Sequence, residues 1–151
     1  MNLDSVAKAG CYPWKPQVGA TDLDVWHKYE VPLTGTFRLG ATTMLFTQVY
    51  DSFQGFAVWA YVCLPHDTAD GLLFSSVDDL TSYVDAAFSE KEAVFVLTHN
   101  DRITRWGRHE VADDLLKAAA EFLETLTQSQ SAEGRVEAQF AAIAASELLY
   151  A

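Results

Sequence analysis

Two apolar segments separated by a short polar loop constrain the fold of this chain more than any other feature. The segments are TTMLFTQVY at 42–50 and FAVWAYVCL at 56–64, and the loop DSFQG between them ends in glycine. Apolar runs of this length, rich in aromatic and β-branched residues, are typical of strands. A short loop that ends in glycine favours a direct reversal between antiparallel strands. The sequence therefore predicts a β-hairpin over these residues.

Two further strands are expected before this hairpin. The side chains of VWHKYEVPL alternate between two faces, which predicts a strand at 24–33. Pro32 indicates that this is an edge strand or that the strand ends there. TGTFRLG predicts a short strand that ends at Gly40. The four strands together predict an antiparallel meander in the first half of the chain. In the first of them, one face should carry Val25, His27, Tyr29 and Val31, and the other Trp26, Lys28 and Glu30.

The first 22 residues carry little regular pattern. Within them, CYPWKP contains two prolines that fix an extended, polyproline-like stretch around Tyr12 and Trp14. We expect an extended N-terminal arm that packs along the domain. The alternative is an arm whose aromatic residues contact a partner.

The clearest helix is SSVDDLTSYVDAAFSEK at 75–91. Ser75 or Ser76 can cap it, and Asp78 and Asp79 fall in the first turn, where the helix dipole favours negative charge. Two more helices are predicted, from about 112 to 127 and from about 135 to 149. The side chains expected to face inward are Val77, Leu80, Tyr83, Val84, Ala87 and Phe88 in the first helix, Leu115, Leu116, Ala119, Phe122, Leu123 and Leu126 in the second, and Val136, Phe140, Ile143, Ala144 and Leu148 in the third.

Between the first two helices, EAVFVLTH predicts a strand buried on both faces, and Asn100-Asp101 predicts a two-residue turn into RITRWGR. The whole chain, 1–151, is therefore expected to form a single α+β domain with an antiparallel sheet. Its order is an arm over 1–22, a β-meander, a helix, a β-hairpin and two C-terminal helices, the last within 134–151. The helices should pack mainly on one face of the sheet. At this length, about two-thirds of the unfolded surface can be buried.

Three arginines lie in the predicted hairpin. With a two-residue turn, His99 faces Arg102 and Phe95 faces Trp106, an aromatic cross-strand pair. Arg102 and Arg108 then share the face of Trp106, and Arg105 points to the other face, so the arginines do not converge. Gly107 is a candidate bulge that would re-aim Arg108. The charges either rim the hairpin and pair with acidic helices, or form an anion site or a protein-contact strip.

The charge of the chain is strongly negative and uneven. The net charge is −11. Residues 1–75 carry 7 acidic and 4 basic residues, a net of −3, and residues 76–151 carry 14 and 6, a net of −8. A phosphate backbone would be repelled by most of this surface, which argues against direct nucleic-acid binding. A basic protein partner fits this charge, and so does a simple role in solubility.

The sequence predicts a cytoplasmic protein. No apolar run approaches the roughly 20 residues of a membrane span, and MNLDSVAKAG lacks the regions of a signal peptide. Cys11 and Cys63 lie far apart without a CxxC motif and are expected to be reduced thiols.

The motifs that carry enzymatic chemistry are missing. His99 and Asp101 lie at a turn, His109 lies at a strand end, and no GxSxG, GxGxxG or GxxxxGK[ST] occurs. We therefore expect a protein that is not an enzyme and needs no cofactor. The metal alternatives are Cys63-x-x-His66, half a zinc site that Cys11 and His27 would have to complete, and a calcium-like loop at Asp67 and Asp70 without the remaining oxygen ligands.

The order of elements resembles the type III secretion chaperone-like fold of bacterial proteins, including its YbjN-type relatives. The matching part runs from GTFRLG at 35 to FLETLTQ at 128, and EAVFVLTHNDRITRWGR followed by an acidic helix looks like the second half of that fold. The resemblance implies a small protein-binding chaperone, often a homodimer, without catalytic residues. The chain departs from it in having no long N-terminal helix, an extra strand at 24–33 and a third helix at the C-terminus. The departures weigh against transferring the homodimer and the client-binding mode.

Three functions remain open from the sequence. The leading hypothesis is a non-enzymatic chaperone-like or adaptor protein that binds another protein. The second is an acidic immunity or inhibitor protein that neutralises a basic toxin or nuclease. The third is a small-molecule binder or small enzyme with a sheet–helix pocket near His99, Arg102 and Trp106. The residues expected to bind a partner are the sheet aromatics Trp26, Trp59 and Trp106, taken as exposed, together with Arg102, Arg108, Asp113, Asp114, Glu121 and Glu124.

Overall fold

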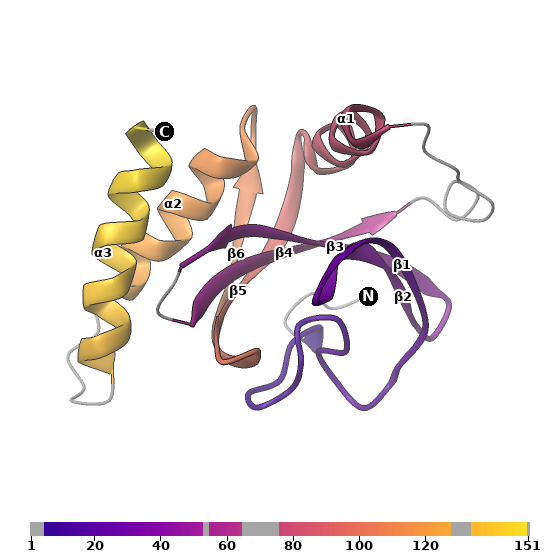
Figure 1. Ribbon diagram of the computed structural model, residues 1–151, viewed down its shortest axis with the longest axis horizontal. Coiled ribbons are helices and arrows are strands. Elements are labelled where there is room, and N and C mark those ends of the chain that lie inside the picture. Colours follow the sequence, from indigo (N-terminus) through magenta and orange to yellow (C-terminus); the bar gives the residue numbers. More distant parts are fainter. Residues whose placement is uncertain (1–4, 53–54, 65–75, 128–133, 151) are drawn as a thin grey trace.

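The computed structural model describes residues 5–52, 55–64, 76–127 and 134–150. They form one six-stranded antiparallel sheet in which every strand pairs with its sequence neighbours, and three helices (Figure 1). The α+β class and the predicted order of elements are therefore confirmed. The elements are β1 (Ala20–Tyr29), β2 (Val31–Leu39), β3 (Thr42–Asp51), β4 (Phe56–Leu64), α1 (Val77–Phe88), β5 (Lys91–His99), β6 (Arg102–Val111), α2 (Leu115–Leu126) and α3 (Gly134–Tyr150).

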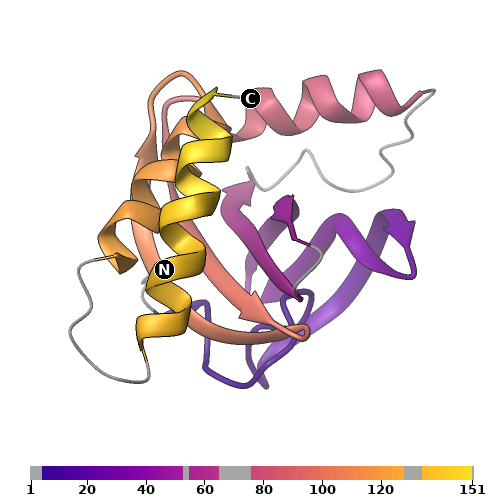
Figure 2. The ribbon, with the colours of Figure 1, turned by 60° about the vertical axis from the view of Figure 1, so that its left-hand side comes forward.

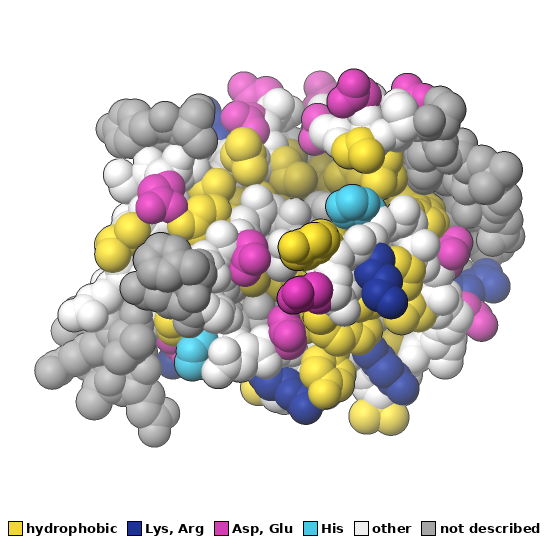
Figure 3. Space-filling view, in the orientation of Figure 1, with side chains coloured by type: hydrophobic (Ala, Val, Ile, Leu, Met, Phe, Trp, Pro, Cys, Tyr) yellow, Lys and Arg dark blue, Asp and Glu magenta, His cyan; other side chains and the backbone are white. Residues whose placement is uncertain are grey.

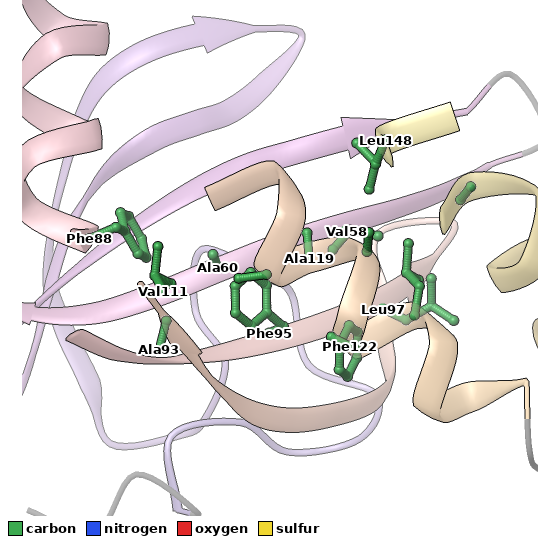
Figure 4. Packing of buried hydrophobic residues seen from close by; sticks show 14 of the residues in the cluster. Val58, Ala60, Phe88, Ala93, Phe95, Leu97, Val111, Ala119, Phe122 and Leu148 are labelled. Atoms are coloured by element: carbon green, nitrogen blue, oxygen red, sulfur yellow. The ribbon is translucent and has the colours of Figure 1, made fainter. Parts of the chain in front are cut away.

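Side chains of the central strands β4 and β5 alternate between two hydrophobic cores, one on each face of the sheet. On one face, Phe95 of β5 stacks on Phe122 of α2 with ring centroids 5.9 Å apart, and α1 and α3 complete this core (Figure 4). All three helices contribute to it, so the helices cover one face as expected. Figures 1 and 2 show α2 and α3 lying side by side over that face.

The N-terminal arm covers the other face. Val6 is fully buried there, beside Trp59 and Tyr61 of β4. The backbone of the arm also pairs with β6, because Gly10 N–H donates to the Ile103 carbonyl at 2.8 Å and Ile103 N–H donates to the Cys11 carbonyl at 2.9 Å. The hydroxyl of Tyr61 donates to the Pro13 carbonyl. The prediction of a packed arm is confirmed for its described part, although β1 already begins at Ala20. The extended stretch predicted for CYPWKP is wrong, because Lys15 N–H donates to the Tyr12 carbonyl at 3.1 Å and closes a turn.

The first strand ends four residues earlier than predicted, at Tyr29. Glu30 has φ 62° and forms a tight turn, so Tyr29 pairs with Val31 in the next strand. A single strand over 24–33 is therefore wrong, because the chain reverses at Glu30 rather than near Pro32. β1 lies at the edge of the sheet, and Tyr29 is 73% exposed.

The predicted register of the β5–β6 hairpin holds only next to the turn. His99 pairs with Arg102, but Leu97 pairs with Arg105 and Phe95 with Gly107, because Thr104 forms a bulge. The Thr104 hydroxyl donates to the Leu97 carbonyl at 3.2 Å and holds this extra residue in place. The bulge is thus at Thr104 and not at Gly107, and the predicted Phe95–Trp106 pair is wrong.

The helix caps agree with the sequence predictions better than the buried faces of the helices do. Ser76 caps α1, accepting a hydrogen bond from Asp79 N–H at 3.1 Å. Asp114 caps α2, which begins at Leu115 rather than at 112. Three side chains predicted to face inward are instead exposed, Val77 to 65%, Leu116 to 39% and Ile143 to 62%. Among the helices that the structure describes, none is long and apolar enough to cross a membrane.

Helix α3 is attached to the sheet through Tyr50 of β3. Its hydroxyl donates to the Glu147 carboxylate, and its ring lies 6.0 Å from that of Phe140. Burial, together with the hydrogen bond to Glu147 and its charge, raises the pKa of Tyr50 to about 12. The phenol therefore stays protonated and remains a donor through the physiological range.

Candidate functional site

A cleft of about 560 Å³ lies between α1, the start of α2 and the sheet strands β1 to β3. We call it the α1–α2 cleft. The sheet forms its floor, α1 forms one wall, and the turn from β6 into α2 forms the other. Its lining residues are His27, Thr34, Thr47, Gln48 and Val49 from the sheet, Val77, Leu80, Thr81, Val84, Asp85 and Ser89 from α1 and its end, and Val111, Asp113, Asp114, Leu115 and Leu116 from the second wall.

The floor of the cleft combines a closed polar pair with aliphatic walls. The hydroxyls of Thr34 and Thr47, both buried, lie 2.9 Å apart and hydrogen-bond to each other. Leu80, Val84 and Val111 supply buried apolar surface beside them. Because the two hydroxyls satisfy one another, an apolar group can enter without leaving a buried polar group unpaired.

Two exposed apolar side chains line the cleft on opposite walls. Val77 on α1 is 65% exposed and Leu116 on α2 is 39% exposed. Both belong to the stripes that the sequence predicts as buried, so each helix presents apolar surface that the sheet does not cover. Any group that occupied the cleft between them would remove this surface from water.

Carboxylates surround the second wall of the cleft. Asp113 and Asp114 line this wall, and Asp85 lies on the opposite wall formed by α1. A smaller adjoining hollow of about 50 Å³ shares Asp113 and Asp114. Acidic side chains gather along the upper edge in Figure 3, over α1 and the turn that leads into α2. The adjoining hollow is lined by Glu110, Ala112, Asp113, Asp114, Lys117, Ala118 and Glu121.

Three of the acidic residues predicted to bind a partner are brought together here. Asp113, Asp114 and Glu121 all line the smaller hollow next to the cleft. Glu124 is exposed on the same helix but lines neither hollow. Sequence reasoning missed Asp85, Val77 and Leu116 as parts of this site. Spacing along the chain offered no signal for them, because α1 and α2 come to line one cleft only in the folded structure.

The aromatic residues predicted to bind a partner differ in exposure. Trp59 is 0% exposed in the core under the N-terminal arm, so its assignment as an exposed sheet aromatic is wrong. Both faces of β4 are covered, which leaves no solvent face for Trp59. Trp26 is half-buried against Tyr83 of α1, at 5.8 Å between ring centroids, whereas Trp106 remains 43% exposed on β6.

The three arginines of the hairpin do not converge. Arg105 Nε lies 2.8 Å from Glu137 Oε2 of α3, on the helix-covered face. Arg108 lies on the arm side and pairs with Glu92 of the neighbouring strand at 3.3 Å. Arg102 binds the arm, because it donates to the Gly10 carbonyl at 3.2 Å and to the Tyr12 hydroxyl at 2.8 Å and lies 3.9 Å from the centre of the Tyr12 ring.

Replacing Arg102 by Ala should therefore loosen the N-terminal arm. The change removes one cation–π contact and two hydrogen bonds at an exposed site, for an expected loss of about 1 kcal/mol in the free energy of unfolding. Trypsin cleavage after Lys8 should become faster. The matched control, Arg108→Ala, removes the exposed ion pair with Glu92 and leaves the contacts of the arm in place, so it should cost less than about 0.5 kcal/mol. Equal cleavage rates in wild type and Arg102→Ala would contradict this role.

A second hollow, of about 480 Å³, lies between the arm and the start of β1. Tyr12 and Trp14, whose rings stack at 5.0 Å, line it together with Phe37. Neither this hollow nor the α1–α2 cleft is lined by His99, Arg102 or Trp106. His99 instead stacks on Phe56 at 4.3 Å. Within the described part of the chain, the three residues of the predicted pocket therefore lie outside both of these hollows.

The proposed zinc ligands do not converge either. Cys11 and Cys63 pack against the arm-covered core, whereas His27 lines the α1–α2 cleft on the other side of the sheet. Burial raises the pKa of the Cys63 thiol, which disfavours the thiolate that a metal requires. His66, Asp67 and Asp70 lie outside the described residues. Among the residues that are described, no group of three or more His, Cys, Asp or Glu side chains is placed to hold a metal ion.

Comparison of the chain with protein-family models, with curated proteins and with solved structures gives no match.

Proposed function

We propose that this chain is a non-enzymatic protein-binding domain, of an adaptor or chaperone-like kind, that receives an apolar segment of a partner in the α1–α2 cleft. The observation that carries the proposal is the cleft itself, with Val77 and Leu116 exposed on its two walls. Grooves of this kind are used to hold the apolar face of a partner helix or strand.

The shape and lining of the cleft support a bound segment. Two helices and a sheet border it, so its walls belong to regular elements, as in preformed binding sites. The order of elements, which resembles secretion chaperones, also supports a protein-binding role. The two free cysteines suit the reducing cytoplasm, where we propose the protein acts.

A small-molecule binder is the second candidate function. The volume of the cleft, about 560 Å³, falls within the range of about 300–1,000 Å³ common for ligand pockets. This candidate moves the predicted sheet–helix pocket from the β5–β6 hairpin to the α1–α2 cleft. Thr34 and Thr47 could then exchange their mutual hydrogen bond for bonds to a ligand.

Affinity capture from the native host with matched variants tests the proposal. Leu116→Arg places a charge on the wall of the cleft, and we expect it to reduce the captured partner at least about tenfold, since a buried charge costs more than 1.4 kcal/mol. Ile143→Arg makes the same kind of change at an exposed position of α3 that does not line the cleft, and should capture as wild type does.

Each result has a distinct meaning. A partner lost only with Leu116→Arg supports binding in the cleft. A partner captured equally by both variants would show that binding uses another surface. If wild type captures no stoichiometric protein but a metabolite raises its melting temperature and fails to do so for Leu116→Arg, the small-molecule function replaces the proposal.

A further inference from the structure

Carboxylates outnumber cations among the described residues that line the α1–α2 cleft and the adjoining hollow. Neither Lys nor Arg is among the described residues that line the cleft. With the adjoining hollow included, five carboxylates (Asp85, Glu110, Asp113, Asp114 and Glu121) face one ammonium group, that of Lys117, for a net of −4 with His27 left aside. The apolar cleft therefore opens beside a surface of predominantly negative charge.

The start of α2 does not reverse this sign. A helix N-terminus carries the equivalent of about +0.5 charge. Asp114 accepts a hydrogen bond from Leu116 N–H at 2.9 Å and thereby satisfies one of the donors that create this charge. Asp113 and Asp114 together bring two negative charges to the same turn. The carboxylates outweigh the dipole, so the site repels anions and attracts cations.

We infer that the occupant of the α1–α2 cleft is a basic amphipathic segment of a partner protein, with apolar anchors in the cleft and Lys or Arg side chains against Asp113, Glu110 and Glu121. The inference rests on the proposed function and specifies its partner. A second copy of the chain does not fit, because it would bring another net charge of −11 to an acidic surface. The charges should raise the association rate and make the affinity depend on salt.

Three fluorescein-labelled synthetic peptides test the chemistry of the occupant by fluorescence anisotropy with the full chain. The first is a helix-forming peptide with Leu on one face and Lys on the other. The second has Glu for each Lys, and the third has Ser for each Leu. We expect only the first to bind, with an affinity that falls roughly tenfold between about 50 mM and about 300 mM NaCl as exposed charges are screened.

Two charge reversals separate a local site from the general field of the protein. Asp113→Lys and Glu124→Lys both make the net charge less negative by two, but only Asp113 lines the cleft. Asp113→Lys should lower the affinity for the first peptide, with Leu and Lys faces, at least about tenfold. Glu124→Lys should lower it at most about twofold, since a surface charge that does not contact the peptide acts only through the screened field. Equal weakening by both variants would overturn the inference, because binding would then reflect net charge alone.

The remaining outcomes distinguish the inference from the function on which it rests. If the second peptide, with Glu for Lys, binds as tightly as the first, and Leu116→Arg abolishes the binding of both, the basic partner is wrong and the binding cleft stands. If the third peptide, with Ser for Leu, binds as tightly as the first, the inference that apolar side chains anchor the partner is wrong. If Leu116→Arg leaves the affinity for the Leu–Lys peptide unchanged, the cleft is not the binding site and the proposed function fails as well.

Discussion

Replacing Trp59 by Ala is expected to destabilise the fold by about 3–5 kcal/mol, the usual cost of deleting a fully buried aromatic side chain. Trp59 is 0% exposed in β4, and Trp14 of the arm packs against it edge-on at 6.2 Å. Its indole N–H also donates to the Thr98 hydroxyl at 3.2 Å. The substitution therefore leaves a cavity beneath the arm and removes a buried hydrogen bond. Urea unfolding followed by far-UV circular dichroism measures the loss.

Two control variants identify burial as the cause. Trp106→Ala removes the same side chain from an exposed position on β6 and should cost less than about 1 kcal/mol. Trp59→Phe keeps most of the ring volume but removes the indole donor, and should fall between the two. Equal losses for Trp59→Ala and Trp106→Ala would contradict the burial of Trp59 beneath the arm.

The order of elements could be predicted from the sequence because its signals are local. Strand length and apolar character located β3 and β4 to within a residue, since these properties are read within one segment. The sequence narrows the cap of α1 to Ser75 or Ser76, of which Ser76 is the cap, because capping joins a side chain to the backbone three residues on. None of these features depends on how distant parts of the chain meet.

The facing of side chains could not be predicted so well because it depends on distant packing. An apolar strand such as β4 does not reveal that both of its faces are covered, so Trp59 was assigned to the surface although the arm buries it. One bulged residue, Thr104, moved Phe95 from Trp106 to Gly107. The hairpin turn alone gives no sign of this extra residue, and a one-residue shift changes the face of every side chain beyond it.

The candidate site was predictable only in its acidic part. Asp113, Asp114 and Glu121 lie close together in sequence, and their shared surface follows from one helix start. The apolar cleft beside them joins His27 of β1, Val77 of α1 and Leu116 of α2, which are far apart along the chain. Amphipathic patterns predicted Val77 and Leu116 as buried, because a pattern shows which face of a helix is apolar but not how much of that face the sheet covers.

Replacing Gly35 by Ala should displace β1 from the sheet. An added Cβ atom would lie 2.1 Å from the Asp24 carbonyl oxygen and 3.1 Å from Val25 Cα. Both neighbours are backbone atoms of the adjoining strand, which cannot rotate away as a side chain can. We expect a loss of about 3 kcal/mol in the free energy of unfolding, at the upper end for overpacking. A larger increase in hydrogen exchange over wild type for the β1 amides than for the β5 amides would locate the damage.

The same substitution should also weaken binding, because β1 brings His27 to the α1–α2 cleft. The control is Gly19→Ala, whose nearest contact would be the flexible Gln17 side chain at 3.4 Å, with an expected change within about 0.5 kcal/mol. A Gly35→Ala protein with the wild-type unfolding midpoint would show that β1 and β2 do not approach so closely. Gly35→Ala could lose affinity for the first peptide while the amides of α1 and α2 stay protected from hydrogen exchange. That result would show that the sheet floor of the cleft contributes to binding independently of its helices.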